Sequence, residues 1–345
     1  FLPVAAGTAA IGPRSAPWLH ALFNLGVLAL VAGLGWQWWP ALGVAGCALP
    51  ASFLWLAALT LPALWRAGGE RLLRAGIATA VGFGGLAALA GALLLGLLSA
   101  PPAWLPALVD VHAGFGVVGW MLVLLAAVGR VTMPMFQATR ALPARVAGGW
   151  LGLAVGGLVL AGAAHLAWPR GPALAAFLAV AGAGFALGVL IPQWPVSKPR
   201  RHPLYRQWRW GAWLLLAAAG ALVAGRGVVA GVLAIGLGLP LLVGAMALEI
   251  VPFVTWIALR RRIPRGTQVP GVARLLEDAP KQRVWRAQWL ATLATLAALA
   301  WPRPVVVALA GLLLAAAWAL AGWTLAGVWR AARRFERHVA ASGRD

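Results

Sequence analysis

Long apolar runs, separated by short basic segments, occupy almost the whole chain. A membrane-spanning helix needs roughly 20 predominantly apolar residues, and ten runs approach or exceed this length. None of them alternates apolar and polar positions as barrel strands do, so the pattern predicts an all-α, polytopic transmembrane helix bundle. The predicted spans lie near residues 18–39, 41–65, 77–99, 109–131, 146–168, 173–194, 210–225, 228–259, 287–302 and 304–329.

Four of these predicted spans depart from the ordinary length. The seventh and ninth are short, so their ends are the least defined. No segment of domain size separates the spans, and residues 1–345 are therefore expected to form a single integral membrane domain. The second and eighth spans are long and contain internal prolines, which predicts kinks, tilting or extension beyond the bilayer. These prolines are Pro50, Pro62, Pro240 and Pro252.

The composition agrees with this interpretation, because 62% of the 345 residues are hydrophobic, the mean hydropathy is +0.87 and only 7 residues are acidic. Soluble domains of ordinary composition do not approach these values. The formal net charge of +21 would suit a nucleic-acid-binding protein if the basic residues covered a solvated domain, but they lie between the apolar runs. The lipid bilayer, and not nucleic acid, is the expected partner.

Lys and Arg are distributed unequally between the two sides of the predicted membrane. One side carries 24 of the 28 Lys and Arg residues, and Arg130 lies inside the fourth span. The opposite side carries only Arg170, Arg226 and Arg303. Basic loops are retained on the cytoplasmic side during insertion. We therefore expect both termini in the cytoplasm and a multi-pass protein of a bacterial inner membrane.

Polar residues inside the predicted spans are few, and ionisable ones at membrane depth are functional candidates by default. His20 begins the first span one turn before Asn24, which predicts a polar pair at the helix end. Arg130 and Glu249 both fall in the cytoplasmic half of their spans and are expected to pair. The other two candidates are the histidines His112 and His165.

His112 and His165 lie at equal depth in neighbouring spans, each about one turn below the periplasmic face. Two imidazoles at matching depth are what a six-coordinate b-type haem requires as axial ligands. Gly116 and Gly119 share the helix face of His112 and would leave room for the macrocycle. The three periplasmic arginines are candidate partners of the haem propionates. The competing interpretation is that each histidine is a hydrogen-bonded interfacial residue.

The fourth span, VDVHAGFGVVGWMLVLLAAVGRVTMPMFQ, resembles the second helix of haem-copper oxidase subunit I, including the cbb3 and nitric-oxide-reductase relatives. The resemblance implies that His112 is a low-spin haem ligand and that Trp120 and Pro134 occupy family positions. The segment LEIVPFVTWIAL is similar to a motif of small subunit-I-like membrane proteins that share the first motif.

Oxygen or nitric oxide reduction in that family requires three further histidines for a second metal, besides the ligands of two haems. This chain has 5 histidines, and His202 and His338 fall in basic segments assigned to the cytoplasm. Terminal oxidase chemistry by this chain alone is therefore excluded by its ligand count.

The leading functional expectation is a membrane b-type haem-binding protein, a degenerate relative of oxidase subunit I. It would serve electron transfer, redox sensing or assembly in a respiratory complex, with other subunits of that complex as possible partners. Two alternatives stay open. One is a haem-free structural or accessory subunit, and the other is a small-solute or proton-coupled transporter that uses Glu249 and Arg130.

Overall fold

The computed structural model describes residue 7 and residues 11–194, 202–264 and 266–342. These residues form helices joined by short connections, and no strand occurs among them. Among the described residues, eight helical segments are long and apolar enough to cross a membrane, which indicates a multi-pass membrane protein. The chain divides into two compact units, one formed by Phe1–Gly188 with Ala219–Arg226 and the other by Val189–Ala218 with Gly227–Asp345.

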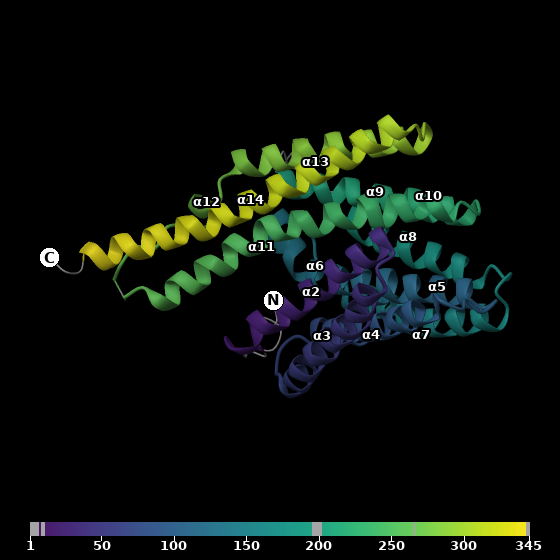
Figure 1. The fold of residues 1–345 in the computed structure, drawn as a ribbon. Helices are drawn as coiled ribbons and strands as arrows, with labels where there is room; N and C mark the ends of the chain where they lie inside the picture. The colour runs from purple at the N-terminus through teal and green to yellow at the C-terminus, as the bar shows by residue number, and fades with distance from the viewer. Residues whose placement is uncertain (1–6, 8–10, 195–201, 265, 343–345) are drawn as a thin grey trace. The chain divides into compact units, whose positions relative to one another are not determined.

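The first unit contains the helices of the N-terminal half of the chain (Figure 1). α2 packs on α3, α3 packs on α4, and α4 packs on the long helical segment that follows. The elements are α2 (Ser15–Trp36), α3 (Trp39–Arg66), α4 (Arg71–Leu97), α5 (Leu105–Gly114), η1 (Phe115–Leu122), α6 (Val123–Thr132), η2 (Met133–Gln137), α7 (Ala144–Ala167) and most of α8 (Ala173–Gln193).

Glycines set how closely the helices of the first unit approach one another. A Cβ added at Gly33 of α2 would lie 2.5 Å from the Leu42 side chain of α3, and one at Gly76 of α4 would lie 2.6 Å from Ala127 of α6. Lipid provides no hydrophobic drive between helices, so close van der Waals contact at small residues contributes much of the association. Leu64, Leu73, Ile77 and Val81 form the buried cluster between α3 and α4.

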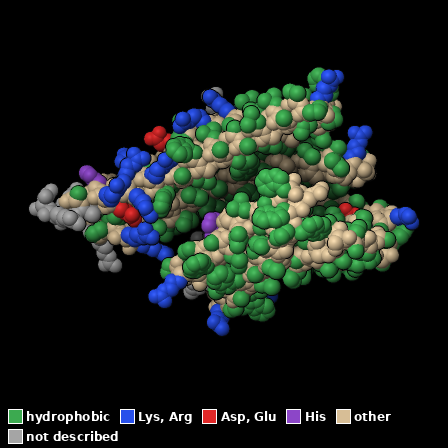
Figure 2. Space-filling model, in the orientation of Figure 1, with side chains coloured by type: hydrophobic (Ala, Val, Ile, Leu, Met, Phe, Trp, Pro, Cys, Tyr) green, Lys and Arg blue, Asp and Glu red, His purple; other side chains and the backbone are tan. Residues whose placement is uncertain are grey.

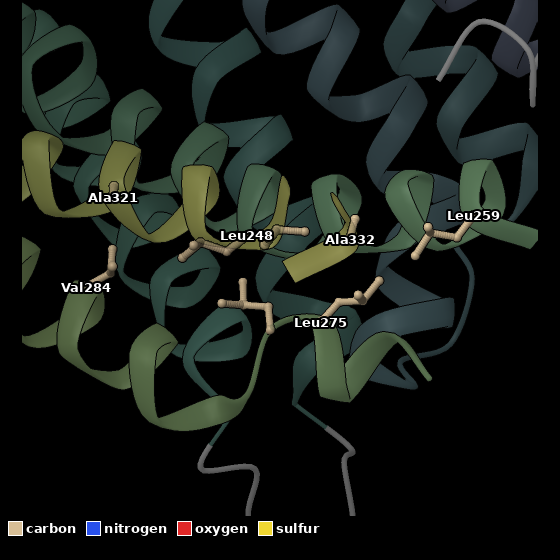
Figure 3. Packing of buried hydrophobic residues seen from close by; sticks show 8 residues of the cluster. Leu248, Leu259, Leu275, Val284, Ala321 and Ala332 are labelled. Atoms are coloured by element: carbon tan, nitrogen blue, oxygen red, sulfur yellow. The ribbon is translucent and has the colours of Figure 1, made fainter. Parts of the chain in front are cut away.

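The second unit consists of the end of α8, most of α9 (Pro203–Val223) and the helices of the C-terminal third of the chain. α13 and α14 form a helical hairpin, and α11 runs beside α14 (Figure 1). Leu248 and Leu259 of α11, Val284 of α13 and Ala332 of α14 belong to one buried cluster (Figure 3). The remaining elements are α10 (Gly227–Gly231), η3 (Val232–Gly238), α11 (Leu239–Arg262), α12 (Val272–Leu275), α13 (Asp278–Ala300) and α14 (Pro304–Ser342).

Two of the ten predicted spans, the seventh and the ninth, do not belong to the eight helices that meet the length and hydropathy requirement. Both are helices all the same, because α9 has 21 residues and α13 has 23. Each helix begins several residues before the apolar run, because charged residues such as Arg206 and Lys281 already belong to its first turns. The apolar runs therefore located these two helices correctly but underestimated their lengths.

In the part of the chain that the structure describes, three π-helical segments, η1, η2 and η3, interrupt the long helices. Pro134 lies inside η2, and Pro240 lies two residues after the end of η3. A proline cannot donate the helical hydrogen bond and clashes with the carbonyl four residues earlier, so a wider turn accommodates it. η1 contains no proline and begins three residues after His112. Isolated π-helical turns of this kind are frequent at functional sites.

Hydrophobic side chains cover much of the outer surface in Figure 2. On α2, Leu28 is 69% exposed and Val31 is 63% exposed, and only Gly26 and Gly33 of that helix are buried. Exposed leucine and valine along an entire helix suit contact with lipid chains rather than water. The helix surface thus supports a bilayer as the solvent of this protein.

Close packing at Gly119 gives a direct test of the first unit. A Cβ at Gly119 would lie 2.5–2.7 Å from Phe83, whereas one at Gly116 on the same segment would meet nothing within 4 Å. We expect Gly119→Ala to destabilise the protein by about 1–3 kcal/mol through overpacking, and Gly116→Ala to be nearly neutral. Thermal unfolding of the detergent-solubilised protein measures both. Equal effects of the two substitutions would contradict this packing.

Candidate functional sites

His112 projects from α5 toward α4. Its Nδ1 lies 2.9 Å from the backbone oxygen of Ala87, and a Cβ at Gly91 would lie 3.1 Å from the ring. A carbonyl oxygen only accepts hydrogen bonds, so Nδ1 carries the proton and donates it. The Nε2 atom then holds the lone pair and has no hydrogen-bond partner in the described part of the chain.

His165 near the end of α7 binds a different partner. Its Nε2 lies 2.9 Å from Oδ2 of Asp110 on α5, and the residue is 8% exposed. The carboxylate accepts this hydrogen bond, so Nε2 is the donor atom. The Nδ1 atom is buried and has no hydrogen-bond partner among the described residues.

The structure does not bring the two histidines to a common site. Asp110 and His112 are two positions apart, which is about 200° around the helix axis, so α5 presents them to different neighbours. At the same level Gly162 of α7 contacts Val111 of α5, since a Cβ there would lie 3.7 Å from the valine. Each imidazole is held by its own partner, Ala87 for His112 and Asp110 for His165, so the two side chains do not face each other as a pair of axial ligands in this arrangement.

The space beside the two glycines on the His112 face is only partly open. Phe83 of α4 packs over Gly119 and its ring lies 5.4 Å from that of Phe115. The position beside Gly116 is open. Trp120 of η1 packs edge-on against Phe53, with ring centroids 4.9 Å apart.

The three arginines proposed for the propionates are exposed residues of short connections. Arg170 and Arg226 belong to the first unit and Arg303 to the second. The guanidinium of Arg303 stacks on Trp301, 4.7 Å from the ring centroid. This contact is typical of a residue that anchors a helix at a membrane surface.

His20 and Asn24 form the polar pair that their spacing predicts. The Asn24 side-chain amide donates to the backbone oxygen of His20 over 2.7 Å and lies 3.2 Å from the imidazole nitrogens. His20 also lines a cavity of about 270 Å³ between α2, α3 and η1, together with Phe53 and Trp120. The cavity is mostly apolar, and His20 is the one ionisable group among its described lining residues.

The predicted pairing of Arg130 with Glu249 is wrong, because each residue has another partner. Arg130 forms an ion pair with Glu70, which precedes α4. Glu249 of α11 pairs with Lys281 of α13, with Nζ and Oε1 separated by 2.7 Å. The predicted spans place Lys281 in a loop, but α13 begins at Asp278 and therefore carries the Lys281 ammonium group in its first turn.

Around Glu249, the second unit contains a group of ionisable side chains that we name the acid–base cluster: His202, Glu249, Asp278 and Lys281. The side chains of Glu249 and Lys281 are only 7% and 6% exposed. His202 Nε2 lies 3.6 Å from Oε1 of Glu249 and 3.5 Å from Oδ1 of Asp278, whose side chain is 71% exposed. The cluster thus connects a buried carboxylate to the protein surface.

A second polar pair lies on α9 and α13, farther along the chain from His202 and Lys281. Gln207 of α9 donates a hydrogen bond to Gln288 of α13, and both residues are buried. Within the described ranges, Oε1 of Gln207 and Nε2 of Gln288 have no hydrogen-bond partner. The Thr292 hydroxyl donates to the backbone oxygen of Gln288 over 2.8 Å. A buried amide with unused hydrogen-bonding atoms is costly unless water or a ligand pairs with it.

Comparison with known proteins gives no match to a protein-family model, a curated protein or a solved structure. Within the described ranges, no three His, Cys, Asp or Glu side chains are placed to hold a metal ion together. Sequence reasoning missed Lys281, Asp278 and the inward position of His202, since all three fall in a basic or mixed-charge segment. The one available signal was the acidic residue Asp278, which lies in the first turn of α13 ahead of the apolar run, as is common at helix starts.

The buried pair gives a stability prediction. Loss of one partner leaves an uncompensated buried charge, so we expect Glu249→Gln and Lys281→Met each to cost about 3–5 kcal/mol. The double variant should cost less than the sum of the single ones. Unfolding in detergent, analysed as a double-mutant cycle, measures the coupling.

Glu70→Gln is the matched control, because Arg130 and Glu70 are 20% and 42% exposed and such pairs contribute only about 0–1 kcal/mol. Additive effects of Glu249→Gln and Lys281→Met would show that the two charges do not interact.

Proposed function

We propose that this chain is a ten-span protein of the bacterial inner membrane, with both termini in the cytoplasm, and that it takes up protons from the cytoplasm through Glu249. The eight long apolar helices account for most of the spans, and α9 and α13 are long enough to supply the other two. The uneven distribution of Lys and Arg supports the orientation.

The observation that carries the proposal is a nearly buried carboxylate with a connected series of ionisable groups leading to the surface. Asp278 is exposed, His202 is 30% exposed, and Glu249 is 7% exposed. Histidine changes its charge near neutral pH and exchanges protons with carboxylates. Separations of 3.5–3.6 Å are longer than direct hydrogen bonds, so a small rotation or one bridging water completes each transfer.

Lys281 gives proton binding a structural consequence. In the ionised form Glu249 accepts a hydrogen bond from the Lys281 ammonium. A proton on Glu249 removes the negative charge that holds Lys281, and the buried ammonium must then find another acceptor. Each proton taken up therefore changes a contact between α11 and α13, which is the type of coupling that a proton-driven membrane protein uses.

The depth of the cluster agrees with a cytoplasmic entry point. Glu249 lies 22 residues after Gly227, the first residue of the same span, which is about 33 Å along a helix. The hydrocarbon core is about 30 Å thick, so Glu249 lies near its cytoplasmic boundary. The Gln207–Gln288 pair lies farther toward the membrane centre and offers the next hydrogen-bonding groups for water.

Proton uptake is testable with the full chain in liposomes that contain a pH-sensitive dye. An inward-negative potential set with potassium and valinomycin drives protons into the lumen. We expect acidification by the wild type and at least a tenfold lower rate for Glu249→Gln, because the glutamine side chain cannot carry the proton. Glu70→Gln should conduct like the wild type.

The proposal would be overturned if liposomes that contain the wild-type protein acidify no faster than empty liposomes. An active Glu249→Gln protein would also exclude Glu249 as the proton acceptor. In either case Glu249 and Lys281 would form a structural ion pair.

A second candidate function is binding of one b-type haem by His112, in electron transfer or redox sensing with partner subunits of a respiratory complex. The hydrogen bond from Nδ1 to Ala87 supports it, because haem- and metal-ligating histidines commonly donate their other ring proton to a carbonyl and so expose the lone pair of Nε2. The π-helical segment η1 begins about one turn after His112, and it contains Gly116, beside which the space is open. A bound haem would supply one-electron chemistry there.

The haem proposal predicts a Soret absorption band in the purified protein. We expect His112→Ala to abolish the band and His165→Ala to retain it, since His165 is occupied by Asp110. The optical spectra of both variants, prepared with added haem at equal protein concentration, measure this. Loss of the band in both would restore a two-ligand site, and a wild type without it would end the proposal.

A further inference from the structure

A groove lies between α11 and α14 at the ends of these helices that carry the arginines. It has a volume of about 890 Å³. Its apolar part is formed by Val254 and Ala258 of α11 and Trp329 of α14, and its basic part by Arg262, Arg333 and Arg337. In Figure 2 the Lys and Arg side chains of this unit gather where α11 and α14 end. The groove is therefore amphipathic.

The two walls of the groove change character in the same direction. On α11 the lining residues run from Val254 to Arg262, and on α14 they run from Trp329 to Arg337. The two helices lie side by side and both lead toward their arginine-rich ends (Figure 1). An occupant must accordingly be apolar at one end and anionic at the other.

The positive charge of the groove is only partly neutralised within the protein. Glu336 is the one acidic residue of the lining, and it lies 3.4 Å from Arg262 in an exposed pair that contributes little stability. Arg333 stacks on Trp329 with its guanidinium carbon 3.6 Å from the ring centroid, which keeps its charge beside the groove. Two arginines, Arg333 and Arg337, thus remain available to an anionic group.

We propose that this groove binds one anionic phospholipid of the cytoplasmic leaflet, with the headgroup phosphate at Arg333 and Arg337 and an acyl chain along Val254, Ala258 and Trp329. Guanidinium groups bind phosphate oxygens in two-pronged hydrogen bonds. Juxtamembrane basic residues attract anionic lipid, and pockets of this type between helices recognise lipid headgroups. The apolar part distinguishes a lipid from free phosphate, because a soluble anion would gain nothing from it.

Native mass spectrometry of the detergent-solubilised full chain tests the proposal, with phosphatidylglycerol and phosphatidylcholine as probes. We expect one phosphatidylglycerol per chain and at least tenfold weaker binding by the variant Arg333→Gln with Arg337→Gln. The matched control is Arg283→Gln with Arg286→Gln, which removes two exposed arginines of α13 outside the groove. This control should bind lipid as the wild type does.

A second variant, Ala258→Trp, fills the apolar part and leaves all the arginines in place. It should also lose the lipid, and its unfolding temperature in detergent shows whether it still folds. Equal losses in both arginine pairs would reduce the effect to general surface charge. Equal binding of phosphatidylcholine, displacement by inorganic phosphate, or a dimer of the chain without lipid would each overturn the proposal.

Discussion

Lipid offers no hydrogen-bond partners, and this constraint governs the structure at every level. It requires the backbone to form helices, since each spanning segment must satisfy its own amide and carbonyl groups. It also acts on side chains, because buried hydroxyl groups turn back to the carbonyl one turn earlier in their own helix. Thr60 donates to Leu56 and Thr292 donates to Gln288 in this way. Polar atoms that cannot turn back must find a partner on another helix.

The interhelical polar contacts are therefore the parts of the molecule most open to functional use. His112 reaches a carbonyl of α4, His165 reaches Asp110, and Glu249 reaches Lys281. The first two are single hydrogen bonds, and among the described residues neither continues to a further ionisable group. Only the third continues outward through further ionisable groups, which is the reason for preferring proton uptake over a purely structural role.

The cofactor question turns on packing as well as on ligands. Glycines near a histidine in the sequence predict free space beside the helix, but a side chain of a neighbouring helix can fill that space. Phe83 does so at Gly119, whereas the face of Gly116 stays open. On the helix face of His112, α4 therefore fills the space beside Gly119 and leaves the space beside Gly116 open.

The two proposals for the second unit share helix α11 but depend on different physical interactions. The acid–base cluster is buried, and its charges are set against one another at close range. The groove between α11 and α14 is open at the surface, and its arginines are screened by water and salt. A lipid in the groove would contact α11 beyond Glu249, on the arginine side of the helix, so the proton site and the lipid site can be tested separately.

The sequence by itself determined that the chain is an all-helical membrane bundle, because apolar run length and the scarcity of acidic residues are sufficient for that. It also identified the His20–Asn24 pair, since both residues lie on one helix and their spacing decides the contact. Contacts between helices depend on rotation and on where each helix begins, which the pattern of apolar residues does not specify. The tertiary structure alone therefore decided that Glu249 pairs with Lys281, that Arg130 pairs with Glu70, and that His112 and His165 bind different neighbours.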